Sequence, residues 1–420
     1  MQANRNIHGK KIYKETELIV RFKNTVSATG SSQMATQYAA GIKKSFGKNK
    51  HYKLVTLKAG QTVQQAMARF KSDPNVASVD YNHYVYPAAT PNDTSFALQW
   101  GLSNTGQMIN GVTGTVNADI GVTGAWDTIF NCGSTIVAVL DTGIHHDHPD
   151  LINNMVPVGI MADFVDAGDN DPSPLVGTGA AEIHGTNVAG IIGAQGNNTT
   201  GVSGVCWGVR ILPIRVITDT GGTSDDLISG IDHAINNGAR VINMSLALSG
   251  NSQAVSDAIT RALNAGIVVV VAAGNAGVDV ETTNSFTYPC RHTQANLICV
   301  AALNNIFGLA TFSAPDVGSN FGVTSVDVGA PGSFIYNTST ATGYNFFSGT
   351  SQASPHVAGL AAMLIAYNPS FTYIDVVNAI KNGGTLTPSL SGTTSTGRAI
   401  NALGSLHYIN TPRGVSATVP

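Results

Sequence analysis

Four polar side chains in this sequence stand where chemistry could be performed, each beside a glycine-rich bend. They are Asp141 after the apolar residues 137–140, His184 in His-Gly-Thr, Asn275 in Ala-Ala-Gly-Asn, and Ser351 in Gly-Thr-Ser. A hydroxyl, an imidazole and a carboxylate can together perform nucleophilic acyl transfer, and an asparagine amide can stabilise a developing oxyanion. Taken singly, each residue also has an ordinary structural interpretation as a helix cap, a turn residue or a structural histidine.

Short apolar segments lead into several of these positions and predict a parallel β-sheet. They lie at residues 136–140, 211–216, 241–244, 267–273 and 297–301. Short continuous apolar strands that alternate with helices are typical of a parallel sheet covered by helices on both faces. Functional groups gather at the carboxyl ends of such strands. We therefore expect an α/β fold that presents the four polar residues at strand ends and nearby helix starts.

The composition excludes several classes of protein. Of the 420 residues, 43% are hydrophobic, 11% are charged and 46 are glycine. Disorder requires low hydrophobicity and high net charge, which this chain lacks. The net charge is −3 without a dominant basic run, so we expect no nucleic-acid partner. Apolar runs such as 267–273 are far shorter than the ~18 residues that a membrane helix needs.

The first 87 residues predict a separate, small α+β domain. Strand-like segments occur at 18–22, 53–57 and 76–79, and helical spacing occurs at 31–46 and 62–70. Residues 88–95 resemble a linker, and residues 407–420 resemble a loose tail. Residues 1–90 carry a net charge of +10, whereas residues 91–420 carry −13. This split suits two domains that attract each other, although a solvated basic face would also produce it.

The four motifs together resemble the subtilisin-like serine proteases (the subtilase family). The order is Asp, His 43 residues later, Asn, and Ser 167 residues after the His, and Asp…His…Ser is the subtilisin order. The resemblance extends from about residue 17 to residue 406. It implies a ferredoxin-like inhibitory propeptide over residues 1–88, a subtilisin-like catalytic domain over 89–406, and a tail over 407–420.

The family resemblance implies a role for each motif residue. Ser351 attacks the peptide carbonyl, His184 moves the proton, Asp141 orients the imidazole, and Asn275 with the Ser351 N–H holds the oxyanion. The implied substrate-binding residues, whose small walls suit large apolar side chains, are Ser245, Leu246, Ala247, Ala272, Ala273, Gly274 and Thr287.

Three positions depart from the common family pattern. Gln352 follows the nucleophile where methionine is common, Asn187 replaces a second histidine, and Ala247 replaces a glycine in the substrate-pairing strand. None of these departures removes a catalytic group.

The resemblance also implies bound calcium. The matching ligands are Asp93, Asp150 and, in the loop 195–202, Asn197, whose position in that loop could be displaced by one residue. Such hard oxygen ligands suit Ca²⁺. A second calcium site could use Asp163, Asp169 and Asp171, although acidic loops of this kind are more often simply solvated.

The cysteines and the N-terminus bear on the compartment. Cys132 and Cys206 each lie four residues before a predicted strand. If those strands are parallel neighbours, as the family's sheet order implies, the two cysteines lie level, which implies a Cys132–Cys206 disulfide and, by remainder, Cys290–Cys299. In a cytosolic protein all four could be free. Residues 1–11 contain no apolar signal segment. The resemblance favours a secreted, monomeric protease whose signal peptide has been removed and whose maturation bond lies near Ala88–Ala89.

Two other functions compete with this reading. An esterase of the α/β-hydrolase class would show Gly-x-Ser-x-Gly and the order Ser…Asp…His, which this chain does not. A binding module built on an inactive protease fold would retain the motifs without turnover. The intact motif residues favour an endopeptidase that acts on polypeptides.

Overall fold

The computed structural model describes residues 13–47, 52–84, 90–165, 171–174, 183–283 and 286–410. The chain divides into two compact units, Met1–Pro87 and Ala88–Pro420. No helix within the described residues is long and apolar enough to cross a lipid bilayer.

The N-terminal unit is a four-stranded antiparallel sheet with two helices. Its elements are β1 (Tyr13–Phe22), α1 (Ala28–Tyr38), β2 (Gly41–Phe46), β3 (Tyr52–Thr56), α2 (Val63–Lys71) and β4 (Val76–His83). The strand order is β2-β3-β1-β4, which with the βαββαβ chain order is the ferredoxin-like arrangement that the sequence predicts. Alternate residues of β1, namely Leu18, Val20 and Phe22, enter the core with Val55 and Phe70.

One helix prediction in this unit is wrong in its extent. The helical spacing over 31–46 is divided between α1, which ends at Tyr38, and strand β2, which begins at Gly41. Ile42 pairs with Val55 of β3 in an antiparallel ladder. Because that pairing satisfies the backbone groups of an otherwise open sheet edge, it outweighs the local helical pattern.

The C-terminal unit contains the remaining helices and strands. They are β5 (Met108–Ile109), β6 (Val112–Thr113), α3 (Val122–Trp126), β7 (Ile136–Asp141), β8 (Ala162–Asp163), α4 (His184–Gly193), β9 (Arg210–Arg215), α5 (Ser224–Asn236), β10 (Val241–Met244), α6 (Gln253–Asn264), β11 (Val268–Ala272), β12 (Leu297–Leu303), β13 (Val328–Pro331), β14 (Ile335–Thr338), β15 (Tyr344–Phe347), α7 (Thr350–Tyr367), α8 (Tyr373–Gly383), β16 (Thr385–Leu386), β17 (Arg398–Ala399) and α9 (Ala402–Asn410).

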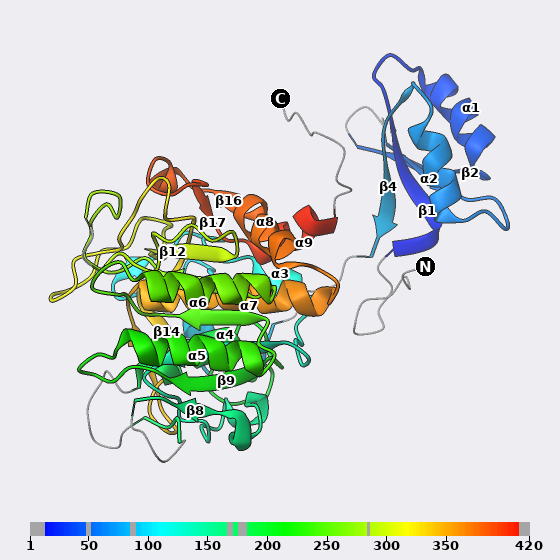
Figure 1. The fold of residues 1–420 in the computed structure, drawn as a ribbon. Helices are drawn as coiled ribbons and strands as arrows, with labels where there is room; N and C mark the ends of the chain where they lie inside the picture. Colours follow the sequence, from blue (N-terminus) through cyan, green and yellow to red (C-terminus); the bar gives the residue numbers. More distant parts are fainter. Residues whose placement is uncertain are drawn as a thin grey trace. The chain divides into compact units, whose positions relative to one another are not determined.

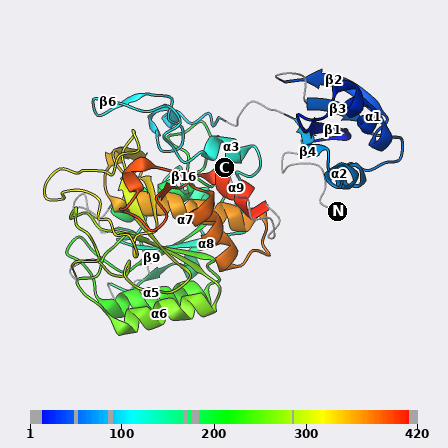
Figure 2. The same ribbon diagram turned by 90° about the horizontal axis from the view of Figure 1, so that it is seen from above.

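A mostly parallel sheet forms the centre of this unit. Its strand order is β16-β17-β13-β12-β11-β10-β7-β9-β8, and only β16 runs antiparallel to its neighbour. Helices α5 and α6 cover one face, while α7 and α8 lie on the other (Figures 1 and 2). Helix α4 packs beside α7. Strands β7, β10, β11 and β12 are almost entirely buried apolar residues, as a sheet covered on both faces requires. The predicted α/β fold class is therefore confirmed.

The last helix continues beyond the boundary expected at residue 406. Helix α9 runs to Asn410, and the Tyr367 hydroxyl donates to the Asn410 side-chain oxygen over 3.3 Å. Buried Leu406 and partly buried Ile409 pack against the main core. Residues 407–410 thus belong to the folded unit, and the rest of the expected tail lies outside the described residues.

Candidate active site

Asp141 is the last residue of β7 and lies at the carboxyl end of the sheet. Its side chain is 1% exposed. Its Oδ1 accepts a hydrogen bond from the Thr142 N–H over 2.8 Å and lies 2.7 Å from His184 Nδ1. Because an ionised carboxylate can only accept, this contact assigns the proton to Nδ1 and leaves His184 Nε2 as the imidazole's basic nitrogen.

His184 is the first residue of α4, and the glycine after it allows the start of this helix to approach Asp141 at the end of β7. A Cβ at Gly185 would overlap the Gly143 carbonyl and press on Asp141. The His184 side chain is 25% exposed, so the imidazole reaches solvent while its carboxylate partner does not. Burial opposes the charged imidazole, but the charge and hydrogen bond of Asp141 outweigh it and raise the pKa of His184 above its ordinary value.

Ser351 occupies the first turn of α7. Its hydroxyl donates to the Ser245 carbonyl over 3.2 Å, and the Ser245 hydroxyl donates to the Ser351 carbonyl over 2.9 Å. These two bonds tie the start of α7 to the segment that follows β10. The position places the Ser351 N–H among the N-terminal donors of a long helix, where the helix dipole favours negative charge.

Asn275 follows β11 and is oriented by the residue before the serine. Its Oδ1 accepts hydrogen bonds from both the backbone N–H and the hydroxyl of Thr350, each over 2.9 Å. The Nδ2 group therefore points elsewhere, and it donates to Asp316 Oδ2 over 3.4 Å.

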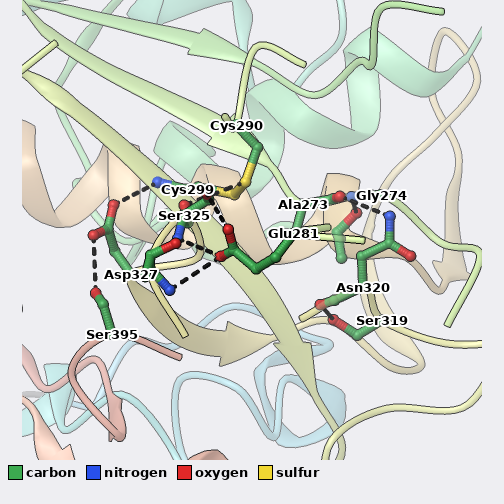
Figure 3. The surroundings of a disulfide bond; sticks show 12 residues. Ala273, Gly274, Glu281, Cys290, Cys299, Ser319, Asn320, Ser325, Asp327 and Ser395 are labelled. Atoms are coloured by element: carbon green, nitrogen blue, oxygen red, sulfur yellow. Dashed lines mark hydrogen bonds between the residues drawn. A yellow bond between two sulfur atoms is a disulfide. The ribbon is translucent and has the colours of Figure 1, made fainter. Parts of the chain in front are cut away.

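Asn320 braces the bend that carries Asn275. Its Nδ2 donates to the Ala273 carbonyl (Figure 3). Its Oδ1 accepts from the N–H groups of Ala276 and Val278. The side chain is buried, and Gly274 adopts a φ of +100° at the bend. Sequence reasoning missed Asn320, because its contacts join segments about 45 residues apart.

Two adjoining clefts meet at Ser245, Leu246 and Ala247. One, of about 450 Å³, is lined by His184, Thr142 and residues 217–219, 221–224 and 245–249. The other, of about 420 Å³, is lined by Ser351, Asn275, Ala272 and Gly274 among others. His184 thus lines one of the two clefts, and Ser351 and Asn275 line the other.

Not every predicted substrate-binding residue lines these clefts. Ala273 is buried, and Thr287 is buried with its hydroxyl donating to the Thr283 carbonyl. Phe286, which precedes Thr287 and is 57% exposed, lines both clefts instead. Residues 217–219 and 221–224 form a further wall, which no sequence motif marks beyond its glycines.

Two positions that depart from the family pattern lie against each other. Gln352 Nε2 donates to Asn187 Oδ1 over 3.2 Å, and Asn187 Nδ2 donates to the Thr338 carbonyl over 3.0 Å. Both side chains are buried. This amide pair joins α4, which carries His184, to α7, which carries Ser351.

Comparison with known proteins agrees with this arrangement. Residues 133–394 match the subtilase family model, and residues 3–82 match the fervidolysin N-terminal prodomain. The chain belongs to the subtilase family. It is therefore a subtilisin-like serine protease preceded by a prodomain, as the motifs suggest.

Individual relatives of this subtilase match over most of its length. A thermophilic serine proteinase from Bacillus sp. strain AK1 is 36% identical over 359 residues, covering 85% of this chain and 79% of the relative. Subtilisin NAT from Bacillus subtilis subsp. natto is 33% identical, covering 88% and 86%. A solved protease from Pseudoalteromonas arctica aligns with a TM-score of 0.64 and 29% identity, covering 77% of this chain and all of that one.

The expected calcium ligands of this subtilase converge on one loop. Asp93 accepts from the backbone N–H groups of Asn197 and Asn198, over 2.7 and 3.4 Å. Asp150 Oδ1 accepts from the side chain of Asn198 over 2.8 Å, so that the amide nearest this carboxylate belongs to Asn198 rather than Asn197. Both carboxylates are buried.

The electrostatics of these two carboxylates suit a cation. Burial raises the pKa of Asp93, its backbone hydrogen bonds act in the opposite sense, and the charge of Asp150 raises the pKa further. Two buried carboxylates that repel each other are relieved by a hard cation, and carboxylate, amide and carbonyl oxygens are its usual ligands. Within the described residues, no cluster of three or more His, Cys, Asp or Glu side chains offers a metal site, so amide and carbonyl oxygens would have to complete this one.

The two described residues of the second suggested calcium site, Asp163 and Asp171, have other partners. Asp163 forms a buried ion pair with Arg215, with Nη1 and Oδ2 separated by 2.9 Å, and also accepts from the Val165 N–H. Asp171 accepts from the Ser173 N–H. Asp169 lies outside the described residues. The guanidinium of Arg215 supplies the positive charge that a metal would have brought to Asp163.

Two disulfides are present, and they are the pairs that the family resemblance implies. Cys132 pairs with Cys206, and Cys290 pairs with Cys299. The second bond ties the loop before β12 to that strand beside two carboxylates, Glu281 and Asp327, that accept backbone N–H groups (Figure 3). Since Phe286 lies four residues before Cys290, this disulfide anchors the loop that lines both clefts.

Proposed function

We propose that this subtilase is a secreted, autoprocessed endopeptidase in which Ser351 is the nucleophile, His184 the general base and Asp141 the group that orients the imidazole. The observation that carries the proposal is the 2.7 Å contact between His184 Nδ1 and buried Asp141 at the cleft that adjoins Ser351. Extracellular proteases among its relatives support secretion.

The first step is attack by Ser351 on a peptide carbonyl. The hydroxyl turns from the Ser245 carbonyl toward His184 Nε2, which takes its proton as the Oγ–C bond forms. Asp141 keeps the Nδ1 proton in place and stabilises the imidazolium, the direction in which the pKa of His184 is already raised.

The oxyanion and the leaving group complete the acyl transfer. The Nδ2 group of Asn275, held by the two bonds from Thr350, and the Ser351 N–H donate to the tetrahedral oxygen. The imidazolium then gives its proton to the leaving amine as the C–N bond breaks, which yields the acyl-enzyme. His184 then takes a proton from water as the hydroxide adds to the acyl carbon. It returns that proton to Ser351 Oγ as the Oγ–C bond breaks and the acid product leaves.

Substrate binding is proposed along the 245–247 segment. An extended peptide that pairs with this segment lies across both clefts, with its main chain held as an added strand. The wall formed by Ala272, Gly274 and Leu246 leaves space for a long side chain at the P1 position, and its apolar surface favours large apolar residues.

The N-terminal unit is proposed to be the intramolecular inhibitor of the catalytic unit. Its match to a protease prodomain and the opposite net charges of the two halves support this assignment. Residues 1–88 would be released by cleavage near Ala88–Ala89, and both residues lie outside the described residues. Calcium held by Asp93, Asp150 and the 195–202 loop would stabilise the mature form.

Intact mass measured against time tests the proposal directly. The purified chain and its Ser351→Ala variant are incubated in millimolar calcium. We expect loss of roughly the first 88 residues from the parent alone, together with fluorophosphonate labelling of the parent alone. Processing or labelling that persists in Ser351→Ala would refute the assigned nucleophile. Mature material that begins after Phe96 would refute the assigned domain boundary.

A further inference from the structure

The loop before Asn320 places a carboxylate in the Ser351 cleft. Asp316 lines this cleft, and within the described residues it is the only charged side chain among its fourteen lining residues. The others are apolar, glycine or uncharged polar residues, among them Leu246, Ala272 and Val317. The cleft therefore combines apolar walls with a single negative charge.

Backbone pairing holds the two residues that follow this exposed aspartate. The Asn275 carbonyl accepts hydrogen bonds from the N–H groups of Val317 and Gly318, over 3.0 and 3.1 Å. Asp316 Oδ2 in turn accepts from Asn275 Nδ2 over 3.4 Å. Burial raises the pKa of the Asp316 carboxyl, as expected for a carboxylate partly removed from water, while the Asn275 amide opposes that change.

We infer that Asp316 is a specificity residue that admits lysine or arginine at the P1 position of the substrate. The inference rests on the proposed function, since it assumes that the Ser351 cleft receives the P1 side chain. A lysine or arginine can lay its aliphatic stem along apolar walls and bring its charge to the carboxylate that lines the same cleft. The cleft would then accept long basic side chains besides long apolar ones, and it would disfavour glutamate.

The test compares two peptide substrates that differ only at P1, one with lysine and one with norleucine, which lacks the ammonium group. Asp316→Asn removes the charge and keeps an oxygen that can accept from Asn275. We expect the ratio of kcat/KM for lysine over norleucine to fall about three- to tenfold, in line with a partly exposed charge pair. The ratio cancels any effect of the substitution that the two substrates share, including one transmitted through Asn275.

Asp219→Asn is the matched control, because it removes the same charge from the neighbouring cleft. An unchanged lysine-to-norleucine ratio in Asp316→Asn would overturn the inference. An equal fall in Asp219→Asn would also overturn it, because the general negative field of the cleft would then be responsible. Hydrolysis of either substrate by Ser351→Ala would instead refute the proposed function, so the two failures are distinguishable.

Discussion

The buried ion pair between Asp163 and Arg215 offers a sharp test of how this fold tolerates charge. The side chains are 0% and 1% exposed and lie on the neighbouring strands β8 and β9. Asp163→Asn keeps the size of the side chain and an oxygen for the Val165 N–H, but it removes the negative charge that lies 2.9 Å from the guanidinium. Breaking one side of a buried pair typically costs about 3–5 kcal/mol of folding free energy.

The pair between Arg261 and Asp232 is the matched control. It is bidentate, with both N–O distances 2.8 Å, but its side chains are 46% and 40% exposed on α6 and α5. Asp232→Asn should cost about 0–1 kcal/mol, because solvent screens the charges. The two variants should thus differ by at least about 2 kcal/mol, which is roughly a 30-fold difference in the unfolding equilibrium constant.

Urea denaturation followed by circular dichroism, with every variant made in the Ser351→Ala background, measures these differences. The double variant Asp163→Leu with Arg215→Met should recover most of the lost stability, since well-packed apolar residues replace buried ion pairs at little cost. The reasoning fails if Asp163→Asn costs no more than Asp232→Asn, or if the double variant is as unstable as the single one.

Three further predictions concern catalysis and calcium. Because the base must be neutral and Asp141 raises the pKa of His184, kcat/KM of the parent should rise with pH through that pKa. Asp141→Asn should move this rise to lower pH and should lower kcat by about 10⁴. A pH–rate profile that does not move in Asp141→Asn would contradict the pairing of Asp141 with His184. Asn275→Leu should lower kcat by ~10²–10³ with little change in KM, and a loss confined to KM in steady-state kinetics would exclude its oxyanion role. Chelation of calcium should lower the melting temperature by roughly 5 °C in the Ser351→Ala protein and less in Asp93→Ala, and equal falls in both would place the calcium elsewhere.

The sequence predicted most of the sheet because its strands carry strong local signals. Each of the five apolar segments became a parallel strand, with ends shifted by at most two residues, as at β9 and β12. The 31–46 helix was overextended because the pairing of Ile42 with Val55 is a tertiary contact that no local pattern reveals. The same limit applies to α9, whose last residues are held by the distant Tyr367.

Some residues of the candidate site could likewise be predicted from local motifs, whereas others could not. Asp141, His184, Asn275 and Ser351 were identified by motif, and glycines beside them mark the close approaches that the fold requires. Asn320, Phe286 and Asp316 were missed, because their roles depend on loops that meet only in three dimensions. Asp163 was misjudged for a similar reason, since its partner Arg215 lies 52 residues away in the chain.

The Cys132–Cys206 disulfide would hold the two parts of the chain together after a cleavage between the cysteines. The two cysteines are 74 residues apart, and Asp141 and His184 both lie between them. A single cut by another protease molecule anywhere in that stretch would leave the two fragments joined through sulfur. Self-digestion within this segment would therefore yield nicked molecules that still carry both residues, and such nicks would appear only on reducing gels.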